Sequence, residues 1–525
     1  MHLAAWPVFL PLIAGFIVLF AKAKNLLWQR VINLLAVSGL IILSVALIKE
    51  SSTGSLDVYL LGNWVAPFGI VLVLDQLSAL MITVTSVLAL AALVYAIATD
   101  TDAKGDHFHV MFLILLFGLN GAFLTGDLFN LFVFFEVLLL ASYGLLLHGG
   151  GRQRTKAGLH YVIINMVGAT LFLFAVGTLY GILGTLNIAD MAAKVAVLPE
   201  QDLGIIAAAG LLLLVVFGIK AALFPLYLWM PIAYSNASAP VAAMFAIMTK
   251  VGLYAIIRVH GTVFGEGAGE LANFYIPWLL GMGMFTIMLA SFGVMAAKKL
   301  REQVAYLVLA SVAVLLIAVG VNNHLALSAS FYYLIHSTVV AGGLFLLADI
   351  ITRGRGSFDD RLESGFAIPG AILIGVLFMF GTVAITGIPP LSGFFGKMLI
   401  LSASLDHQWS GLILGVVLVA SFLMIITMAR TGSMLFYNVL PANEADTIST
   451  ENKSAGNDVS SVAYSGISTR ISTIAVIFLF AISPLLVLFA QPITAFTESA
   501  AKQQLNSKNY IESVLSEQAV EAEKE

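Results

Sequence analysis

The sequence predicts an all-α, polytopic membrane protein with about 14 transmembrane helices. Of its 525 residues, 60% are hydrophobic and only 10% are charged, whereas a soluble domain carries about 25% charged residues. Apolar stretches of roughly 20 residues recur from end to end, and each can cross a hydrocarbon core about 30 Å thick. The alternating pattern of a membrane β-barrel does not appear in the sequence.

We expect the spans, in chain order, at residues 4–22, 29–48, 72–98, 108–126, 128–147, 157–184, 204–228, 239–259, 274–296, 303–321, 326–350, 366–404, 410–436 and 470–490. If successive spans alternate in direction, one side collects most basic residues, namely Lys22, Lys24, Arg30, Arg152, Arg154, Lys156, Lys298, Lys299, Arg301, Arg353, Arg355 and Arg361. The loops of the other side hold chiefly Lys49 and Lys194. Cytoplasmic loops are enriched in lysine and arginine, so this pattern predicts a cell (inner) membrane protein with both termini outside.

The stretch 366–404 is too long for one straight crossing. Division at Pro389 and Pro390 into two full spans would give 15 helices and place the carboxyl terminus inside. A half-helix of about 15 residues is too short to span the bilayer. We therefore expect one broken helix in this stretch.

Two polar segments, 440–468 and 500–525, are expected to be solvated connectors. The chain contains no cysteine. It therefore offers no disulfide, no thiolate zinc site and no iron–sulfur ligand, and we expect neither a resident cofactor nor a metal.

Four ionisable side chains fall inside the expected spans. Glu136 and Lys250 lie near the centres of their spans, while Lys220 and Lys397 lie close to prolines. Each charge costs about 2.5 to 3.5 kcal/mol at the bilayer centre unless it is paired or hydrated. One alternative is that the lysines extend along lipid to reach the headgroups. Another is a structural ion pair of Glu136 with one lysine, which leaves the other lysines unexplained.

Prolines interrupt two of the spans, at Pro225 and at Pro389–Pro390. A proline removes backbone hydrogen bonds, which a membrane span tolerates only where protein or water satisfies the freed carbonyls. Transporters with inverted repeats carry such broken helices at corresponding positions of their halves. Because the breaks lie five spans apart, we expect helices 1–3 at residues 1–106, a five-helix repeat at 107–262, an inverted second repeat at 263–438, and a polar loop, last helix and polar tail at 439–525.

Lysines and a carboxylate inside a membrane have the chemistry of a proton relay. A buried lysine loses affinity for its proton through desolvation, and a nearby carboxylate restores it. His336 lies deep in its span and is the candidate bridge between such sites, although a membrane histidine also packs helices through hydrogen bonds. His324 is expected at a loop edge, and His107 and His109 lie at a boundary without a carboxylate pattern that indicates a metal.

Several motifs, in order along nearly the whole chain, resemble one family. Residues 220–258, KAALFPLYLWMPIAYSNASAPVAAMFAIMTKVGLYAIIR, are similar to the central signature of the antiporter-like proton-conducting subunits shared by respiratory complex I and the Mrp-type antiporters. LDQLSALM, LFVFFEVLLLASYGLL and GIPPLSGFFGKMLIL resemble the family's third-, fifth- and twelfth-helix motifs. Within the family, the chain most resembles the D subunits of the Mrp-type antiporters.

The resemblance implies a role for each candidate residue. Glu136 and Lys220 would be the interacting pair of a first half-channel, Lys250 the central relay, His336 the bridge and Lys397 the exit lysine of the second half. The resemblance also implies fourteen helices with inverted five-helix repeats.

Two departures from the family pattern stand out. Many complex I relatives carry histidine and acidic residues where this chain has Tyr227, Ile232 and Tyr234, which counts against a complex I assignment. Family members often place a basic residue shortly after the histidine of the eleventh span, where this chain has Val340 and Ala341. The relay between Lys250 and Lys397 is therefore expected to depend more on water.

These observations lead us to expect a transporter subunit rather than an enzyme, which moves protons within a multisubunit Na⁺/H⁺ (or K⁺/H⁺) antiporter. Its partners would be other membrane subunits and the lipid bilayer, with no nucleic acid. The alternative is a proton-pumping membrane subunit of a complex I-like, quinone- or hydrogenase-linked oxidoreductase. A third interpretation is a stand-alone carrier for an organic solute.

Overall fold

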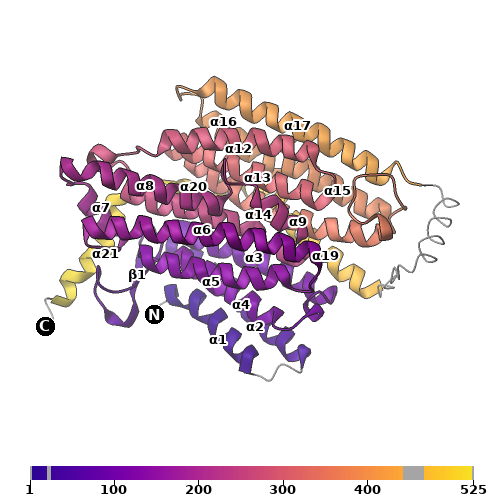
Figure 1. Ribbon diagram of the computed structural model, residues 1–525, viewed down its shortest axis with the longest axis horizontal. Helices are drawn as coiled ribbons and strands as arrows, with labels where there is room; N and C mark the ends of the chain where they lie inside the picture. The colour runs from indigo at the N-terminus through magenta and orange to yellow at the C-terminus, as the bar shows by residue number, and fades with distance from the viewer. Residues whose placement is uncertain (1–2, 21–24, 441–465, 523–525) are drawn as a thin grey trace.

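The computed structural model describes residues 3–20, 25–440 and 466–522. Within these ranges it is a bundle of long helices that run side by side, with one two-stranded β-hairpin (Figure 1). Twelve of the described helices have the length and apolar composition needed to cross a membrane, and three shorter apolar helices accompany them. The all-α membrane fold predicted from the sequence is therefore confirmed.

The first half of the chain forms α1 (Trp6–Phe20), α2 (Leu26–Ser51), α3 (Gln76–Ala98), α4 (Phe108–Leu124), α5 (Leu128–Leu147), α6 (Arg152–Leu183), α7 (Ile188–Val195), α8 (Glu200–Ala221), α9 (Trp229–Asn236), α10 (Ala239–Ala255), the π-helical turn η4 (Ile256–His260) and α11 (Gly261–Val263). The second half forms α12 (Ile276–Ala296), α13 (Leu300–Gly320), α14 (His324–Arg355), α15 (Ala371–Thr386), α16 (Ser392–Ala403), α17 (Ser410–Phe436), α19 (Gly466–Leu488), α20 (Ala490–Leu505) and α21 (Ser507–Ala522).

The stretch 72–98, expected as one long span, is divided in the structure. Its first residues belong to strand β2 (Val71–Leu74), which pairs antiparallel with β1 (Asp57–Leu60). Asp75 then starts α3, because its carboxylate accepts a hydrogen bond from the Ser78 backbone N–H at 2.8 Å and the Ser78 hydroxyl accepts one in return. A short apolar run fits a strand or a helix equally well, and this capping box fixes where the helix begins.

The expected break in the span 204–228 is present, but it begins before the proline. Helix α8 ends at Ala221, where Ala222 turns into the left-handed region with φ 58°. The Leu223 N–H reaches back to the Gly218 carbonyl at 2.8 Å, a Schellman-type end that satisfies a terminal carbonyl. Pro225 therefore lies in the connection to α9, not within a helix.

The stretch 366–404 forms two helices, α15 and α16, separated at Pro389 and Pro390. Their 16 and 12 residues correspond to about 24 and 18 Å of helix, so neither reaches across a hydrocarbon core of about 30 Å. Figure 1 shows α15 and α16 following one another across the bundle, with α17 returning beside them. The broken helix is the form observed, in preference to two full spans.

Three helices occupy the centre of the bundle. In the most apolar stretch of each helix, the share of buried residues is 100% for α10 with its continuation, 94% for α13 and 89% for α14. The share is only 28% for α17. Helices that are apolar on all sides pack in the interior, whereas a helix with most of its surface free faces lipid or a partner. Two of the candidate residues, Lys250 and His336, lie on these central helices.

The carboxyl-terminal tail is not a solvated connector, contrary to the expectation for 500–525. Helices α20 and α21 continue to residue 522, and Ala500, Ala501 and Tyr510 are buried against the bundle. The Gln504 amide of α20 also donates to the Ile257 carbonyl at 3.2 Å. A buried stripe of small and aromatic residues anchors this polar sequence. Most of the other expected connector, 440–468, lies outside the described residues.

Candidate functional site

Lys220 occupies the last turn of α8, directly before the first helix break. Its side chain is 8% exposed, and its Nζ donates a hydrogen bond to the Asn165 Oδ1 of α6 at 3.0 Å. The carbonyl end of a helix carries partial negative charge, which favours a cation there. Lys220 is thus held inside the bundle and does not extend to the headgroups as the lipid-facing alternative requires.

A small cavity adjoins Lys220. It measures about 20 Å³ and is lined by Lys220, Asn165, Tyr161, Trp229 and Met248, among others. A cavity of this size with polar partners holds about one water molecule. The Trp229 indole closes one side, since it stacks on Tyr161 at 5.1 Å between ring centroids and donates to the Ile219 carbonyl at 3.1 Å.

Glu136 is half-buried on α5, and its Oε1 is buried without a hydrogen-bond partner. Among the described residues, no basic nitrogen lies within 4.0 Å of its carboxylate. A direct structural ion pair with a lysine is therefore not what holds this carboxylate in the bundle. Any influence on Lys220 acts through space or through water.

Lys250 is completely buried at the centre of the molecule, and its Nζ has no hydrogen-bond partner. The neighbouring Gly252 explains how α10 approaches the break so closely, because a Cβ there would lie 2.4 Å from the Ala221 nitrogen and 2.8 Å from the Lys220 carbonyl carbon. The backbone of α10 therefore touches the end of α8 two residues beyond Lys250. This contact sets Lys220 and Lys250 at the same level in the bundle.

His336 of α14 is completely buried against the second break. Its Nε2 lies 3.1 Å from the Ala384 carbonyl, and its Nδ1 lies 2.7 Å from the Ser392 Oγ. Because a carbonyl only accepts, Nε2 carries the proton and Nδ1 of the neutral ring accepts from the serine hydroxyl. Ser392 in turn lies 2.8 Å from the Ser483 Oγ of α19, so a chain of two hydroxyls leads away from the ring.

Lys397 of α16 is 6% exposed and bridges the second break. Its Nζ donates to the Thr386 carbonyl at the end of α15 at 2.8 Å and to the Ser421 hydroxyl of α17 at 3.1 Å. Both lysines near a break therefore lie at the carbonyl end of the helix segment that precedes it. Lys397 and Ser421 also line an apolar groove of about 480 Å³ between α16 and α17.

The candidate residues thus cluster around two helix breaks. Lys220 and Lys250 lie next to the first break. His336 and Lys397 lie at the second, where they hydrogen-bond to the backbone carbonyls of Ala384 and Thr386. No hydrogen bond joins Lys250 to His336 or to Lys220 among the described residues. The structure brings the four residues into two pairs and leaves a gap between the pairs.

Sequence reasoning missed the polar partners of these residues. Asn165, Ser392, Ser421 and Ser483 are neutral, and the scan for charges inside spans passed over them. Their signal was present, because each is a polar residue within a long apolar run. Interhelical hydrogen bonds in membranes commonly use these residue types.

A buried ion pair was also missed. Arg258 of the π-helical turn η4 binds the Asp75 carboxylate at 2.5 Å and lies over the rings of Tyr254 and Tyr510 at 5.4 and 5.3 Å. The pair ties α10 to the start of α3 and to α21. The two charges of this pair compensate each other, and the pair holds the central helix α10 in place.

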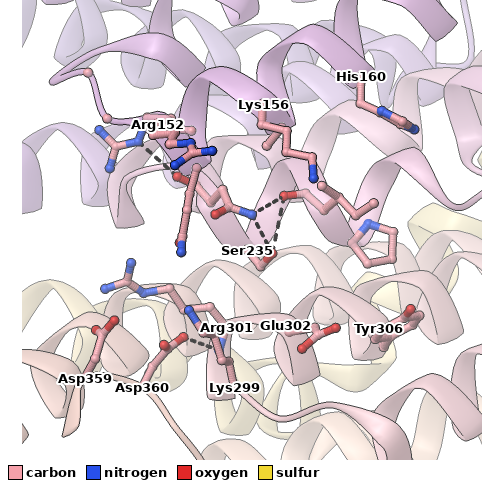
Figure 2. Close-up of a pocket in the computed structure, with 18 residues that line it drawn as sticks. Arg152, Lys156, His160, Ser235, Lys299, Arg301, Glu302, Tyr306, Asp359 and Asp360 are labelled. Carbon is pink, nitrogen blue, oxygen red and sulfur yellow. Dashed lines mark hydrogen bonds between the residues drawn. The ribbon is translucent and has the colours of Figure 1, made fainter.

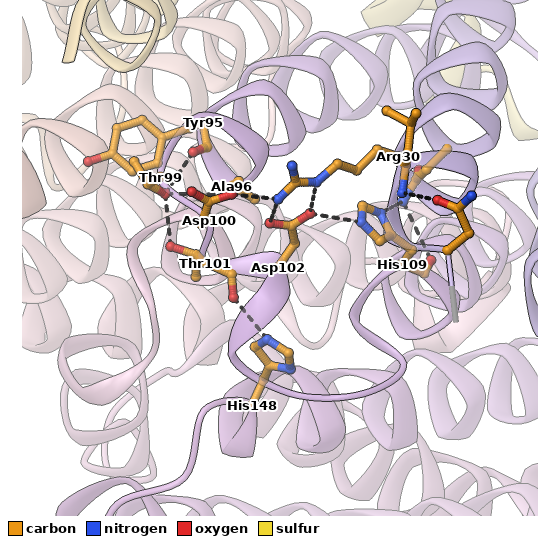
Figure 3. Close-up of polar contacts among 12 residues, drawn as sticks. Arg30, Tyr95, Ala96, Thr99, Asp100, Thr101, Asp102, His109 and His148 are labelled. Carbon is orange, nitrogen blue, oxygen red and sulfur yellow. Dashed lines mark hydrogen bonds and ion pairs between the residues drawn. The ribbon is translucent and has the colours of Figure 1, made fainter. Parts of the chain in front are cut away.

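Of the two histidines at this boundary, His109 belongs to a polar network, whereas His107 is exposed (Figure 3). His109 lies 3.0 Å from the Asp102 carboxylate, which also accepts from the Arg30 Nε at 2.6 Å. The described residues contain no group of three or more histidine, cysteine or acidic side chains suited to a metal. His324 is exposed at the start of α14, at the loop edge where we expected it.

Buried ionisable groups beside broken helices are characteristic of membrane proteins that translocate ions. The family model described as NADH:quinone oxidoreductase/Mrp antiporter, TM, matches residues 125–425. The chain belongs to this family.

Its relatives include proteins named as the D subunits of cation/proton antiporters. One of them, from a probable K⁺/H⁺ antiporter of Rhizobium meliloti (strain 1021), is 44% identical over 428 residues, which cover 77% of this chain and 79% of that protein. Another, from a Na⁺/H⁺ antiporter of Alkalihalophilus pseudofirmus, is 35% identical over 98% of this chain and 100% of its own length. Among solved structures, a chain of the Mrp complex from Dietzia sp. DQ12-45-1b superposes with a TM-score of 0.83 at 28% identity, covering 98% of this chain and 99% of that one.

Proposed function

We propose that this chain is the proton-translocating membrane subunit of a multisubunit antiporter that exchanges a monovalent cation for protons. The observation that carries the proposal is the burial of three lysines and a histidine at two helix breaks. The membrane penalises each of these charges, so a role beyond packing accounts for their presence. The named relatives support the assignment, and because they divide between Na⁺ and K⁺, the proposal covers both cations.

In the first half, Glu136 and Lys220 exchange protons with one side of the membrane. Asn165 orients the Lys220 ammonium, and the adjacent cavity supplies room for about one water next to it. The unpartnered Oε1 of Glu136 is free to accept from water. A change of charge on Glu136 alters how favourable a charge on Lys220 is, because the two interact through a poorly screened interior.

Lys250 passes the proton between the halves. A buried ammonium without an acceptor is costly, so the charged state of Lys250 depends on water or on a neighbouring charge. A proton on Lys220 repels a charge on Lys250 at the same level, which couples the two lysines without direct contact.

His336 and Lys397 complete the path at the second break. When a proton arrives at Nδ1 of His336, the ring becomes a donor there, and the Ser392 hydroxyl turns to donate to Ser483. A cation on His336 repels the nearby Lys397 ammonium, which would complete the transfer by releasing its proton to water at the Ser421 hydroxyl.

Everted membrane vesicles that contain the assembled complex test this proposal. The variants Lys220→Ala and Glu136→Gln are expected to abolish cation-driven proton movement, while the exposed-site variant Glu363→Gln retains it. Immunoblotting of the partner subunits establishes that each complex assembles. Unchanged exchange in the Lys220 variant would overturn the assignment.

The second candidate is a proton-pumping subunit driven by a redox reaction, which the family description includes. The two candidates differ in their partners. Affinity purification of the complex followed by mass spectrometry and iron analysis distinguishes them, since the second requires iron–sulfur subunits. Reconstitution of this chain alone tests the stand-alone carrier, which would transport without partners.

A further inference from the structure

A large pocket opens at the end of the bundle where most basic residues lie. It has a volume of about 830 Å³ and is bounded by the start of α6, the end of α9, the start of α13 and the loop after α14. Figure 2 shows two facing banks of side chains, with Arg152, Lys156 and His160 on one and Lys299 and Arg301 on the other. The proton path described above does not use these residues.

Of the five lysine and arginine side chains that line this pocket, only Arg301 has an ion-pair partner within the described part of the chain. Among the described residues, no carboxylate lies within 4.0 Å of the basic groups of Arg152, Arg154, Lys156 or Lys299. Arg154 donates instead to two backbone carbonyls, those of Asn236 at 3.0 Å and His148 at 2.5 Å. Its position is therefore fixed while its charge stays uncompensated.

Three acidic residues, Glu302, Asp359 and Asp360, lie on the same side of the pocket as Lys299 and Arg301 (Figure 2). The Asp360 carboxylate accepts from the Arg301 backbone N–H at 3.2 Å, and the Glu302 carboxylate accepts from the Lys298 backbone N–H at 3.3 Å. Arg301 pairs with Asp349, outside the pocket, at 3.1 Å, and its own Nε remains buried without a partner. The five lysine and arginine side chains of the pocket (Arg152, Arg154, Lys156, Lys299 and Arg301) outnumber its three carboxylates (Glu302, Asp359 and Asp360), so its formal charge is positive, and the Arg301 Nε is an unused buried donor.

The start of α6 adds to this potential. Its cap residue is Gly151, which offers no side chain, so the first N–H groups of the helix have no side-chain acceptor. Helix amino termini carry partial positive charge and bind phosphates through such N–H groups. Unlike the start of α13, which Asp360 covers, this one is open to a ligand.

Apolar side chains lie beside the basic residues of the pocket. Pro231 and Ile232 of α9 and the ring of Tyr306 line the pocket, and Ile232 is 44% exposed. On α6, Leu159 beside the pocket residue His160 is 61% exposed, and Ile163 one turn further is 51% exposed. A free anion would contact only the basic residues, whereas a molecule with a phosphate headgroup and acyl chains would contact both the basic residues and the apolar side chains.

We propose that this pocket binds the phosphate of an anionic phospholipid headgroup. Basic pockets between membrane helices favour such headgroups, and each lysine or arginine near them contributes about 1 kcal/mol, a factor of about five. The lipid contacts α6 and α9 of the predicted first repeat and α13 of the second. It therefore links the two halves of the molecule on the side opposite the β-hairpin.

The test compares the double variant Arg152→Gln/Lys156→Gln with Lys298→Gln in the purified, delipidated complex. Lys298 is an exposed neighbour that does not line the pocket, so it is a matched control. Retained lipids are counted by native mass spectrometry, and thermal stability is followed during titration with phosphatidylglycerol, phosphatidylcholine or inorganic phosphate. Wild type and the Lys298 variant should retain and be stabilised by phosphatidylglycerol, and the double variant should bind it about 25-fold more weakly.

Phosphatidylcholine and inorganic phosphate should give no comparable stabilisation. Equal phosphatidylglycerol binding by the double variant and wild type would overturn the proposal. Stabilisation by inorganic phosphate as large as that by the lipid would make the pocket a free-anion site and overturn the lipid assignment. If the double variant does not assemble, substitution of Lys299→Gln, on the opposite bank, makes the same comparison with about a fivefold expected loss.

Discussion

At the scale of single residues, the charges of this protein fall into two kinds. Arg258 and Asp75 are buried together and satisfy each other at 2.5 Å. Lys250 and Glu136 are held without such partners. A paired charge contributes to structure, whereas an unpaired buried charge costs free energy and is retained for what it does.

Lys250 provides the sharpest residue-scale prediction. Lys250→Met is expected to raise the thermal stability of the complex, by about 1 kcal/mol or more, because it removes an unpaired buried amine and keeps the volume. The same variant should lower exchange about 100-fold if the amine carries protons. Differential scanning fluorimetry and vesicle exchange measure the two effects. A loss of stability together with retained exchange would show that Lys250 is a packing residue.

The hydroxyl chain beside His336 yields a second prediction. Ser392→Ala leaves Nδ1 of His336 and the Ser483 hydroxyl without their shared partner, and exchange should fall about tenfold. Ser392→Thr keeps a hydroxyl and should restore most of the activity. The pH profile of exchange separates a role of Ser392 in proton transfer from a purely structural one. Loss of a proton-transfer group changes the profile, whereas a structural defect only lowers the amount of active complex.

At the scale of elements, the two helix breaks position the site by different means. The first break is created by a left-handed turn at Ala222 and is supported by Trp229 and by Thr286, whose hydroxyl accepts from the Phe224 N–H at 2.9 Å. The second is bridged by side chains, chiefly Lys397 and His336. In both cases neighbouring side chains satisfy backbone groups that the break releases, as a membrane interior requires.

Substitution of Gly393 tests how closely α16 packs against α14 and α15 at the second break. A Cβ at this position would lie 2.1 Å from the Ala384 carbonyl oxygen and 2.6 Å from the His336 Nε2. Gly393→Ala is therefore expected to destabilise the complex by about 1–3 kcal/mol and to lower exchange. Gly415→Ala, where a Cβ meets nothing within 4 Å, is the control and should be neutral or slightly stabilising. Equal stability of the two variants would contradict the close packing at the break.

At the scale of the whole molecule, polar networks near the ends of the bundle tie distant segments together. Asp102, between α3 and α4, joins Arg30 of α2 to His109 of α4. Burial alone would raise the pKa of the Asp102 carboxyl, but hydrogen bonds from His109 and Arg30 outweigh it and hold this pKa below its usual value. The carboxylate therefore stabilises the folded state wherever it is ionised.

The sign of this effect fixes a pH dependence. Because the pKa of Asp102 is lower in the folded state, its contribution is complete above the unfolded value of about 4 and disappears as the pH falls through the folded value. Asp102→Asn is expected to cost about 2–3 kcal/mol near neutral pH, and the difference from wild type should shrink below about pH 4. Thermal denaturation from pH 3 to 8 measures this, with the exposed neighbour Asp106→Asn as control. A difference that grows as the pH falls would contradict the assignment.

The sequence by itself determined the membrane fold, the broken helices and the positions of Glu136, Lys220, Lys250, His336 and Lys397. It did so because a bilayer penalises charge and freed backbone strongly enough for single residues such as Lys250 and Pro390 to stand out in an apolar run. Only the tertiary structure decided that residues 71–74 form a strand and that the polar tail packs as α20 and α21. The cap at Asp75 and contacts such as that of Gln504 with Ile257 control these outcomes.

Tertiary structure likewise decided the partners of the site. Asn165, Ser392 and Ser483 are ordinary polar residues in their own helices and gain their roles only where α6, α16 and α19 meet the lysine and the histidine. The same holds for the basic pocket, whose residues come from helix ends and a loop far apart in the chain. The sequence shows which side chains are costly to place in a membrane. The packing of the helices determines which of their atoms come close enough to contact one another or a ligand.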